Sequence, residues 1–478
     1  MSMSTNKKTK IVATLGPACS TREIIKDMIN AGVNVFRINF SHADYNDVKE
    51  KIAIVRALNE EFGYTTAILG DLQGPKLRVG VMEEGVVVND GDLITFTTAD
   101  DIIGTSKRVF MKYQNFPNDV NPGERILLDD GKLIFEIITT DKKTEVVAKV
   151  IQGGELKSKK GVNLPNTKIS LPAMTEKDIA DAIFAIEQKV DWIALSFVKT
   201  PRDLKDLQEL IAKHSAEKIP IIAKIEMPEA LENIDKIVAY CDALMVARGD
   251  LGVELPAQEV PLVQKQLILR AKTARIPVIV ATQMMETMIT SLTPTRAEVN
   301  DVANSVMDGA DAVMLSGETA TGLYPVQVIE KMTQIIEAVE DSPLIKVPQN
   351  TPQVRTNRFI TKTICHHAAL TANIIEAKAI CTLTNSGYTA FQISAWRPSA
   401  HILVFTSNKR ILTQLNLLWG VKSYFYDKMK STDDTIADVN EIAREQGYVT
   451  KGDYLINLAA MPLKDKGMVN TLRVSEIE

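Results

Sequence analysis

Charged and hydroxyl side chains stand at or near the ends of several short apolar runs in this 478-residue chain. They include Arg37, Lys224, Glu226, Asp250 and Thr282. Two carboxylates, completed by substrate oxygens, are a typical set of ligands for Mg²⁺. Lys and Arg side chains beside them would bind an anionic substrate. These residue types predict metal-assisted chemistry on a phosphate-bearing substrate.

Each of these residues also has a plainer interpretation when it is taken alone. Lys224 and Glu226 are two residues apart, so in a strand they share a face and could form a structural ion pair. Asp250 follows Arg-Gly and could be a helix N-cap.

Gly249 would let the backbone approach an anion closely at the start of a helix. The sequence has no GxxxxGK[ST] motif, so nucleotide phosphates would need the metal and the Arg or Lys contacts. The convergence of all these groups favours a catalytic site.

Eight apolar, β-branched runs predict the strands that position these residues. They span 9–16, 32–40, 66–72, 191–198, 219–227, 242–250, 276–284 and 311–319. Their apolar positions are continuous, which is typical of parallel strands covered by helices. Eight strand–helix units predict a (β/α)₈ barrel, in which the strand ends meet at one rim. An open doubly wound sheet is the weaker alternative, because no G-x-G-x-x-G turn is present.

Capping residues predict where the intervening helices begin and end. The S/T-x-x-E/D patterns predict helix starts at Ser20 and Thr175. Prolines predict further starts at Pro201 and Pro294. Gly32 is expected to end a helix.

The strand spacing is interrupted once, and this divides the chain into domains. After the third strand, apolar runs separated by Asn-Asp-Gly, Asn-Pro-Gly and Asp-Asp-Gly turns predict an inserted antiparallel β domain, a lid at the mouth of the barrel. A Pro- and Asn-containing linker then precedes a third, α/β domain. We expect barrel segments 1–72 and 172–345, a lid over 73–171 and a C-terminal α/β domain over 346–478.

Composition excludes several classes of partner. The chain has 55 Lys and Arg against 60 Asp and Glu, a net charge of -5, which argues against nucleic-acid and anionic-membrane partners. No apolar run approaches the ~20 residues of a membrane span. The N-terminal residues lack the apolar core of a secretory signal. The four cysteines are isolated, as in a reducing compartment. We expect a cytoplasmic protein.

Several long stretches resemble the pyruvate kinase family over essentially the whole chain. They are KIVATLGPACS, VFRINFSHA, GDLQGPKLRVG, SKKGVNLP, IAKIEMPEAL, LMVARGDLGVELP, VIVATQMMETM and PTRAEVNDVANSVMDGADAVMLSGETATGLYP. The resemblance implies phosphoryl transfer from phosphoenolpyruvate to ADP, giving pyruvate and ATP in the last step of glycolysis. It also implies Mg²⁺ or Mn²⁺ as cofactor and a homotetramer.

The resemblance assigns roles to residues in the matching motifs. Glu226 and Asp250 are similar to the divalent-metal ligands. Lys224 resembles the lysine that stabilises the transferring phosphoryl group, and Arg37 matches the arginine that contacts the substrate phosphate. The backbone at Gly249 and Asp250, with Thr282, resembles the seat of the substrate carboxylate. Thr282 also lies near the position where the enolate is protonated, and the sequence leaves the proton donor open. On the nucleotide side the resemblance implies Asn39, Ser41, His42, Arg78 and Lys160.

Two positions depart from the potassium-requiring members of the family. Lys76 stands where they have Glu, and Leu72 where they have Thr. Asn39, Ser41 and Asp71 still offer oxygens to a monovalent cation. An ammonium at Lys76 would instead supply that charge internally, which predicts potassium-independent activity; the alternative is a lysine in solvent.

The C-terminal domain raises the question of an effector. Residues 384–389, TNSGYT, resemble the family's effector phosphate loop, and their hydroxyls and N–H groups suit phosphate. The last loop, 461–467, lacks the family's usual Gly- and Arg-rich form. A sugar phosphate or a nucleotide is one hypothesis; an ordinary strand-to-helix turn without ligand is the other.

Two other functions compete with the kinase hypothesis. A Mg²⁺-dependent enolate lyase or aldolase on the same barrel would act without ADP and would need neither Arg78 nor Lys160. A scaffold that retains only the fold would be expected to have lost a metal ligand or Lys224, and none is lost.

Overall fold

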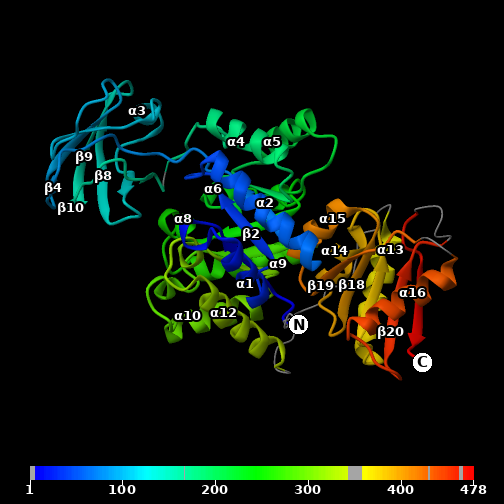
Figure 1. The fold of residues 1–478 in the computed structure, drawn as a ribbon. Coiled ribbons are helices and arrows are strands. Elements are labelled where there is room, and N and C mark those ends of the chain that lie inside the picture. The colour runs from blue at the N-terminus through cyan, green and yellow to red at the C-terminus, as the bar shows by residue number, and fades with distance from the viewer. Residues whose placement is uncertain (1–5, 166, 343–357, 429–430, 462–466) are drawn as a thin grey trace.

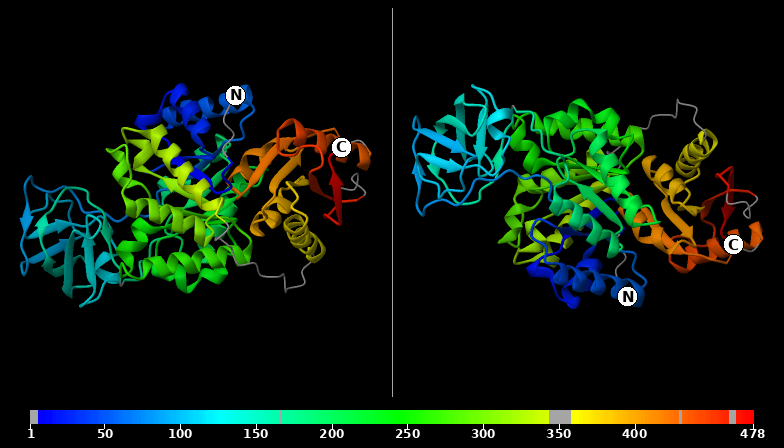
Figure 2. Two further views of the ribbon diagram at one scale, coloured as in Figure 1. Left: turned by 90° about the horizontal axis from the view of Figure 1, so that it is seen from below. Right: turned by 90° about the horizontal axis from the view of Figure 1, so that it is seen from above.

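The computed structural model describes residues 6–165, 167–342, 358–428, 431–461 and 467–478. Three parts are visible in Figure 1, with a central helix-covered barrel between a β domain on one side and an α/β domain on the other. Figure 2 shows the same arrangement from below and from above.

Eight parallel strands close the barrel in the order β1-β16-β15-β14-β13-β12-β3-β2. They are β1 (Lys10–Thr14), β2 (Val35–Asn39), β3 (Ala67–Asp71), β12 (Trp192–Leu195), β13 (Ile221–Ile225), β14 (Ala243–Ala247), β15 (Val278–Ala281) and β16 (Ala312–Leu315). Their side chains are buried on both faces, apart from the half-buried Asn39 at the end of β2. The closed barrel confirms the predicted fold class, and each strand is shorter than predicted.

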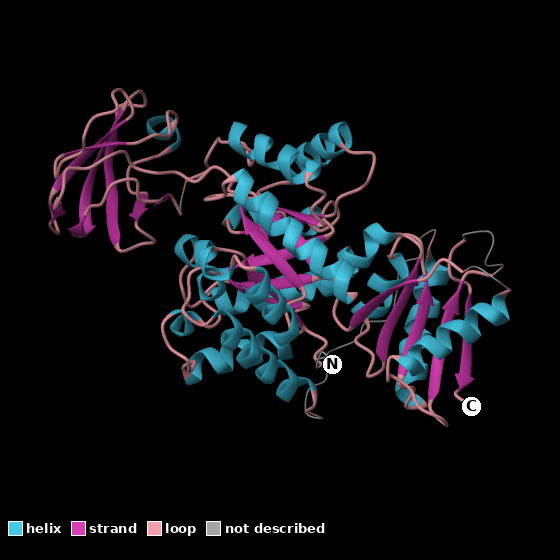
Figure 3. Ribbon diagram, in the orientation of Figure 1, coloured by secondary structure: helices cyan, strands magenta, loops and turns pink. Residues whose placement is uncertain are grey.

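Helices surround the barrel and enclose its outer core (Figure 3). They are α1 (Arg22–Ala31), α2 (Tyr45–Phe62), α4 (Glu176–Glu187), α5 (Pro201–His214), α6 (Pro228–Glu232), α7 (Ile234–Ile237), α8 (Arg248–Glu254), α9 (Val260–Ala274), α10 (Arg296–Asp308), α11 (Gly317–Ala320) and α12 (Pro325–Glu340), with 3₁₀ turns η1 (Pro17–Cys19) and η2 (Glu286–Ile289).

The helix ends follow the predicted capping chemistry in most places. Thr175 forms a capping box with Asp178, Pro201 is the first residue of α5, and Gly32 ends α1 at φ 128°. Two predicted helix starts were wrong, the first by one position and the second by two. The N-cap of α1 is Thr21 rather than Ser20, because the Thr21 hydroxyl accepts the Ile24 N–H. Likewise α10 is capped by Thr295, which pairs with Glu298, so Pro294 lies just outside the helix.

The inserted domain has its own apolar core and its own sheets. A six-stranded sheet has the order β11-β7-β8-β9-β5-β6, and β10 pairs with β4. The elements are β4 (Val87–Val88), β5 (Leu93–Thr97), β6 (Arg108–Phe110), α3 (Phe116–Asp119), β7 (Arg125–Leu128), β8 (Leu133–Thr140), β9 (Glu145–Gln152), β10 (Gly154–Glu155) and β11 (Val162–Asn163). This additional β domain corresponds to the predicted lid, and we keep that name for it. Its paired strands are antiparallel except for β5 and β6, which are parallel and depart from the prediction.

The C-terminal domain closes the opposite end of the barrel. Its sheet, β19-β18-β17-β20-β21, is parallel except for β21. Leu417 joins the apolar core inside the barrel, and the Trp192 indole donates to the Gln414 carbonyl at 3.1 Å. The elements are α13 (Phe359–Ile374), β17 (Ala379–Leu383), α14 (Tyr388–Ala395), β18 (His401–Thr406), α15 (Lys409–Gln414), η3 (Leu415–Leu417), β19 (Val421–Phe425), α16 (Thr432–Glu445), β20 (Tyr454–Ala459) and β21 (Thr471–Glu476).

Candidate active site

Four buried charged groups meet where β2, β3 and β13 end. Asp71 lies between two cations: its Oδ2 accepts from Nε of Arg37 at 2.6 Å, and its Oδ1 is 3.2 Å from Nζ of Lys224. Lys224 Nζ is also 3.0 Å from Oε1 of Glu226. Arg37 and Lys224 are each 9% exposed, and Asp71 and Glu226 are each 1% exposed. The cluster is thus two cations and two anions held out of water.

The neighbouring charges keep these groups ionised despite their burial. Burial alone would lower the pKa of Lys224, but the charges of Asp71 and Glu226 raise it above its ordinary value. Burial would raise the pKa of Asp71, but Lys224 and Arg37 hold it below its ordinary range. The Lys224 ammonium also donates to Oγ of Ser196 at 2.6 Å. Lys224 is therefore a fixed, permanent positive charge.

Glu226 and Asp250 form the pair of carboxylates expected to bind a metal. Burial, and then repulsion from Asp250, raises the pKa of Glu226, while Lys224 opposes the shift. Oε2 of Glu226 accepts the Phe197 N–H at 2.7 Å, which fixes the carboxylate. Within the described residues no group of three or more His, Cys, Asp or Glu is arranged to hold a metal. Two carboxylates with substrate and water oxygens still fit Mg²⁺, and a cation between them would relieve their repulsion.

The predicted carboxylate seat lies beside them in a strained piece of backbone. Thr282 has φ 70° and Gln283 has φ 54°, a left-handed conformation that costs a β-branched residue free energy. The Thr282 hydroxyl accepts the Gly249 N–H at 2.7 Å and donates to the Ala281 carbonyl at 2.6 Å. Arg248 donates to the Thr282 carbonyl at 2.6 Å. Gly249 and Thr282, predicted to act together, are therefore in direct contact.

The residues predicted on the nucleotide side are divided between two domains. Asn39 ends β2, and Ser41 and His42 follow it; Oδ1 of Asn39 accepts the Ser41 N–H at 3.1 Å. Arg78 and Lys160 lie in the lid: Arg78 donates to the Lys159 carbonyl at 2.9 Å, and Lys160 pairs with Asp129 at 2.8 Å.

The two positions that depart from potassium-requiring relatives have different surroundings. Leu72 is buried, and its carbonyl accepts the Ser196 hydroxyl at 2.7 Å. The Lys76 side chain is 32% exposed, and its Nζ lies 3.8 Å from Oδ1 of Asp250. Lys76 therefore faces the barrel mouth.

Comparison with known proteins identifies the family to which this site belongs. The description "Pyruvate kinase, barrel domain" matches residues 6–329, and "Pyruvate kinase, alpha/beta domain" matches residues 362–475. This chain belongs to the pyruvate kinase family. The pyruvate kinase of Geobacillus stearothermophilus is 42% identical over 477 residues, covering 98% of this chain and 80% of that one. That of Mycobacterium intracellulare is 41% identical over 478 residues and covers 99% of both.

A solved structure supports the same assignment. A crystal structure of a pyruvate kinase from Cryptosporidium parvum superposes with a TM-score of 0.91 at 32% identity, covering 99% of this chain and 97% of the other. The protein is thus a phosphotransferase whose substrates and products are phosphoenolpyruvate, ADP, pyruvate and ATP. The enolate lyase or aldolase alternative is not supported, and the kinase hypothesis is confirmed.

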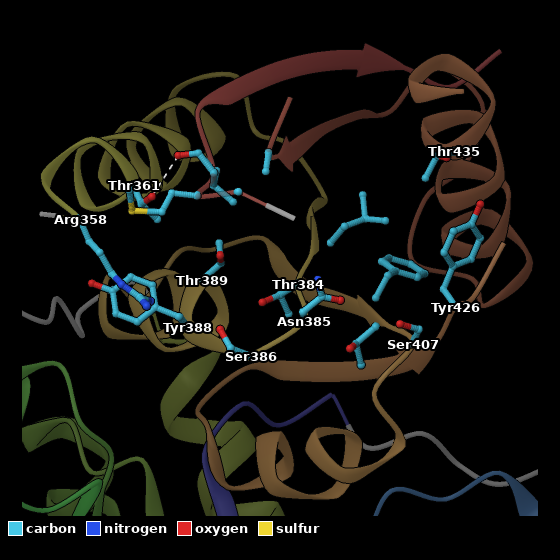
Figure 4. A pocket seen from close by; sticks show the side chains of 17 residues that line it. Arg358, Thr361, Thr384, Asn385, Ser386, Tyr388, Thr389, Ser407, Tyr426 and Thr435 are labelled. Atoms are coloured by element: carbon cyan, nitrogen blue, oxygen red, sulfur yellow. Dashed lines mark hydrogen bonds between the residues drawn. The ribbon is translucent and has the colours of Figure 1, made fainter. Parts of the chain in front are cut away.

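The C-terminal domain of this chain contains a pocket (Figure 4). The predicted effector loop forms one wall of a pocket of about 360 Å³. Thr384, Asn385 and Ser386 line it, and the Arg358 guanidinium stacks on the Tyr388 ring at 4.2 Å beside them. Part of the last loop, 462–466, lies outside the described residues.

Several residues around the active site went unnoticed in the sequence. Ser196 and Phe197 follow β12 and contact Lys224 and Glu226, as described above. A polar residue at a strand end was a signal for Ser196, but nothing in the sequence marks the backbone N–H of Phe197.

In the described residues, none of the helices combines the length and the apolar composition that a membrane crossing requires.

Proposed function

We propose that phosphoryl transfer takes place at the Arg37–Asp71–Lys224–Glu226 cluster. Phosphoryl transfer depends mainly on neutralising charge on the moving group and on in-line positioning. Lys224 supplies a permanent cation whose position is fixed by Ser196, Asp71 and Glu226. That threefold support is the observation on which the proposal rests.

Arg37 is proposed to bind the phosphate of phosphoenolpyruvate. Its Nε is taken by Asp71, and its Nη1 donates to Oγ1 of Thr14 at 3.0 Å, so the guanidinium is oriented before substrate arrives. Such pre-orientation reduces the entropy lost on binding.

We place the substrate carboxylate at Gly249, Asp250 and Thr282. A carboxylate oxygen that accepted the Gly249 N–H would replace the Thr282 hydroxyl as its acceptor. The freed hydroxyl would then be available near the enolate carbon that is protonated. The donor of that proton stays open between Thr282 and a water that it orients.

Glu226 and Asp250 are proposed to hold Mg²⁺, with Mn²⁺ as an alternative ion for the same oxygens. When bound, the ion supplies positive charge to the phosphoryl oxygens. Glu226 directly follows β13, and Asp250 lies in α8, which directly follows the neighbouring strand β14.

For the nucleotide we propose Asn39, Ser41 and His42 from the barrel, with Arg78 and Lys160 from the lid. Arg78 and Lys160 bond to lid groups in this structure. We infer that nucleotide binding moves the lid, so that both residues exchange these bonds for contacts with the nucleotide and water is excluded from the site.

We propose that Lys76 makes the enzyme independent of potassium. Its ammonium lies near Asp250, and Asp71 is already neutralised by Arg37 and Lys224. Assays in sodium- and potassium-free buffer test this: turnover should change less than about twofold when potassium is added, and a many-fold gain would contradict the hypothesis.

The remaining family properties are proposals at the level of the whole protein. We infer a glycolytic, cytoplasmic homotetramer, without nucleic-acid or membrane partners, whose effector, a sugar phosphate or a nucleotide, binds the pocket beside Ser386. Domain boundaries at 72/73, 171/172 and 345/346 are proposed, supported by the separate apolar cores; the last of them lies outside the described residues. Titrating the phosphoenolpyruvate saturation curve with sugar phosphates and nucleotides tests the effector; no shift would favour a turn without ligand.

The decisive experiment is a coupled assay for ADP-dependent pyruvate formation. Lys224→Met should leave the fold intact and lower kcat by several orders of magnitude, since one oriented charge is worth about 10²–10³-fold and this one also orients its neighbours. Lys213→Met, on the exposed face of α5, is the matched control and should keep full turnover. Near-normal kcat in the Lys224 variant would refute the proposal.

A further inference from the structure

Helix α8 joins the barrel mouth to the lid through one buried carboxylate. Glu254, the last residue of α8, is 6% exposed. Its Oε1 accepts a hydrogen bond of 2.8 Å from Nδ2 of Asn163, the last residue of lid strand β11. Figure 1 places α8 on the side of the barrel that faces the lid. The bond therefore crosses the boundary between two domains.

The opposite end of α8 is anchored to the barrel. Arg248 pairs with Asp301 at 2.6 Å and donates to the Thr282 carbonyl, and Gly249 donates to the Thr282 hydroxyl. Asp250 and Glu254 are four residues apart, so they lie on the same face, about 6 Å apart along the axis. Displacement of Glu254 would thus rotate this short helix about its fixed first turn and shift Asp250.

We propose that Glu254 is a positioning residue, which transmits the position of the lid, through Asn163, to Asp250. The inference rests on the proposed role of Asp250 as a metal ligand. The lid carries Arg78 and Lys160, so the link would couple nucleotide-driven movement of the lid to the geometry of the metal site.

The second carboxylate oxygen of Glu254 makes this contact sensitive to movement of the lid. Oε2 of Glu254 is buried and has no hydrogen-bond partner in the described part of the chain. A buried carboxylate with one unsatisfied oxygen costs free energy that water would remove. The bond to Asn163 stabilises the contact between the lid and α8. A lid that moved away would break this bond and expose the carboxylate to water. The contact is therefore one that movement of the lid would make or break, as a switching element requires.

A small cavity beside the bond shows that the contact is not tightly packed. It measures about 30 Å³ and is lined from both domains, by Asn163 and Lys76 on the lid side and by Asp250 and Glu254 on α8. Lys199 also lines it. Since Lys76 pairs with Asp250 at 3.8 Å, two contacts connect the lid side to this helix, one to each of its acidic residues.

The test is a double-mutant cycle on Asn163 and Glu254 in the full-length enzyme. Asn163→Ala and Glu254→Ala should each raise the Mg²⁺ concentration for half-maximal activity about tenfold, the usual effect of losing support behind a metal ligand. The double variant should match the single ones, because both remove the same bond. Glu254→Gln keeps an acceptor for Asn163 and should stay within about twofold of wild type. Asn121→Ala, at an exposed lid position, is the matched control.

Hydrogen exchange followed by mass spectrometry supplies a readout that is independent of turnover. Asn163→Ala should speed exchange in α8, although the substitution is in the lid, and Asn121→Ala should not. Unchanged α8 exchange in Asn163→Ala, or effects of the two single variants that multiply in the double one, would overturn the inference. Asp250→Asn separates the two proposals: normal Mg²⁺ binding by that variant in calorimetry would refute the metal role of Asp250, whereas the exchange of α8 judges the link.

Discussion

Replacing Glu254 by Gln should make the stability of this enzyme less dependent on pH. Burial, with further repulsion from Glu229 and Asp250, raises the pKa of Glu254 from 4.5 to about 7, although the bond from Asn163 opposes the shift. In the unfolded chain the carboxyl returns to its ordinary value. The folded protein therefore holds this proton more tightly than the unfolded chain does.

The sign and size of the effect follow from that difference. A raised pKa in the folded state favours folding below pH 4.5, and this contribution is lost as pH rises toward 7. One pKa unit corresponds to ~1.4 kcal/mol, so the shift amounts to about 3 kcal/mol of stability lost between pH 4.5 and 7.5. Gln cannot ionise and does not incur this loss. Relative to wild type, Glu254→Gln should gain about 3 kcal/mol across that range.

Urea unfolding at half-unit steps from pH 5 to pH 8 measures this difference directly. The control is Glu259→Gln, at an exposed position just before α9, which should show the same pH dependence as wild type. A free-energy difference between Glu254→Gln and wild type that stays constant from pH 5 to pH 8 would refute the reasoning.

Three further perturbations test other parts of the structure. Asp71→Asn leaves Arg37 and Lys224 short of a buried counter-charge, so urea unfolding should show a loss of about 3–5 kcal/mol; a loss below 1 kcal/mol would mean that the cluster relaxes. Arg397→Ala breaks a 2.8 Å buried ion pair with Asp311 that joins the C-terminal domain to the barrel. Calorimetry should show the C-terminal domain unfolding at a lower temperature than in wild type. A single transition at the wild-type temperature would contradict this expectation. Removal of divalent ions by a chelator should abolish pyruvate formation, and Mn²⁺ as well as Mg²⁺ should restore it; activity that survives chelation would exclude the proposed cofactor.

Much of this architecture was predictable because it follows from local patterns. A barrel strand buried on both faces must be apolar throughout, so eight such runs were visible without knowledge of their partners. Helix caps such as Thr175 depend on residues three positions apart, and the turns of the lid depend on neighbouring Asn, Asp and Gly. Once the barrel is recognised, its topology brings strand ends such as Arg37 and Lys224 to one rim.

What the sequence left open depends on contacts between distant residues. Arg37 and Asp71 are 34 positions apart, and Asn163 and Glu254 are 91 positions apart. No periodicity connects such pairs, so the sequence predicts only that Asp71 offers oxygens to a monovalent cation, whereas the structure pairs it with Arg37 and Lys224. Nothing in the sequence singles out Glu254. Only the tertiary structure decides which oxygen is buried, which cation faces it and which lid residue meets it, because burial and charge pairing are properties of the packed chain.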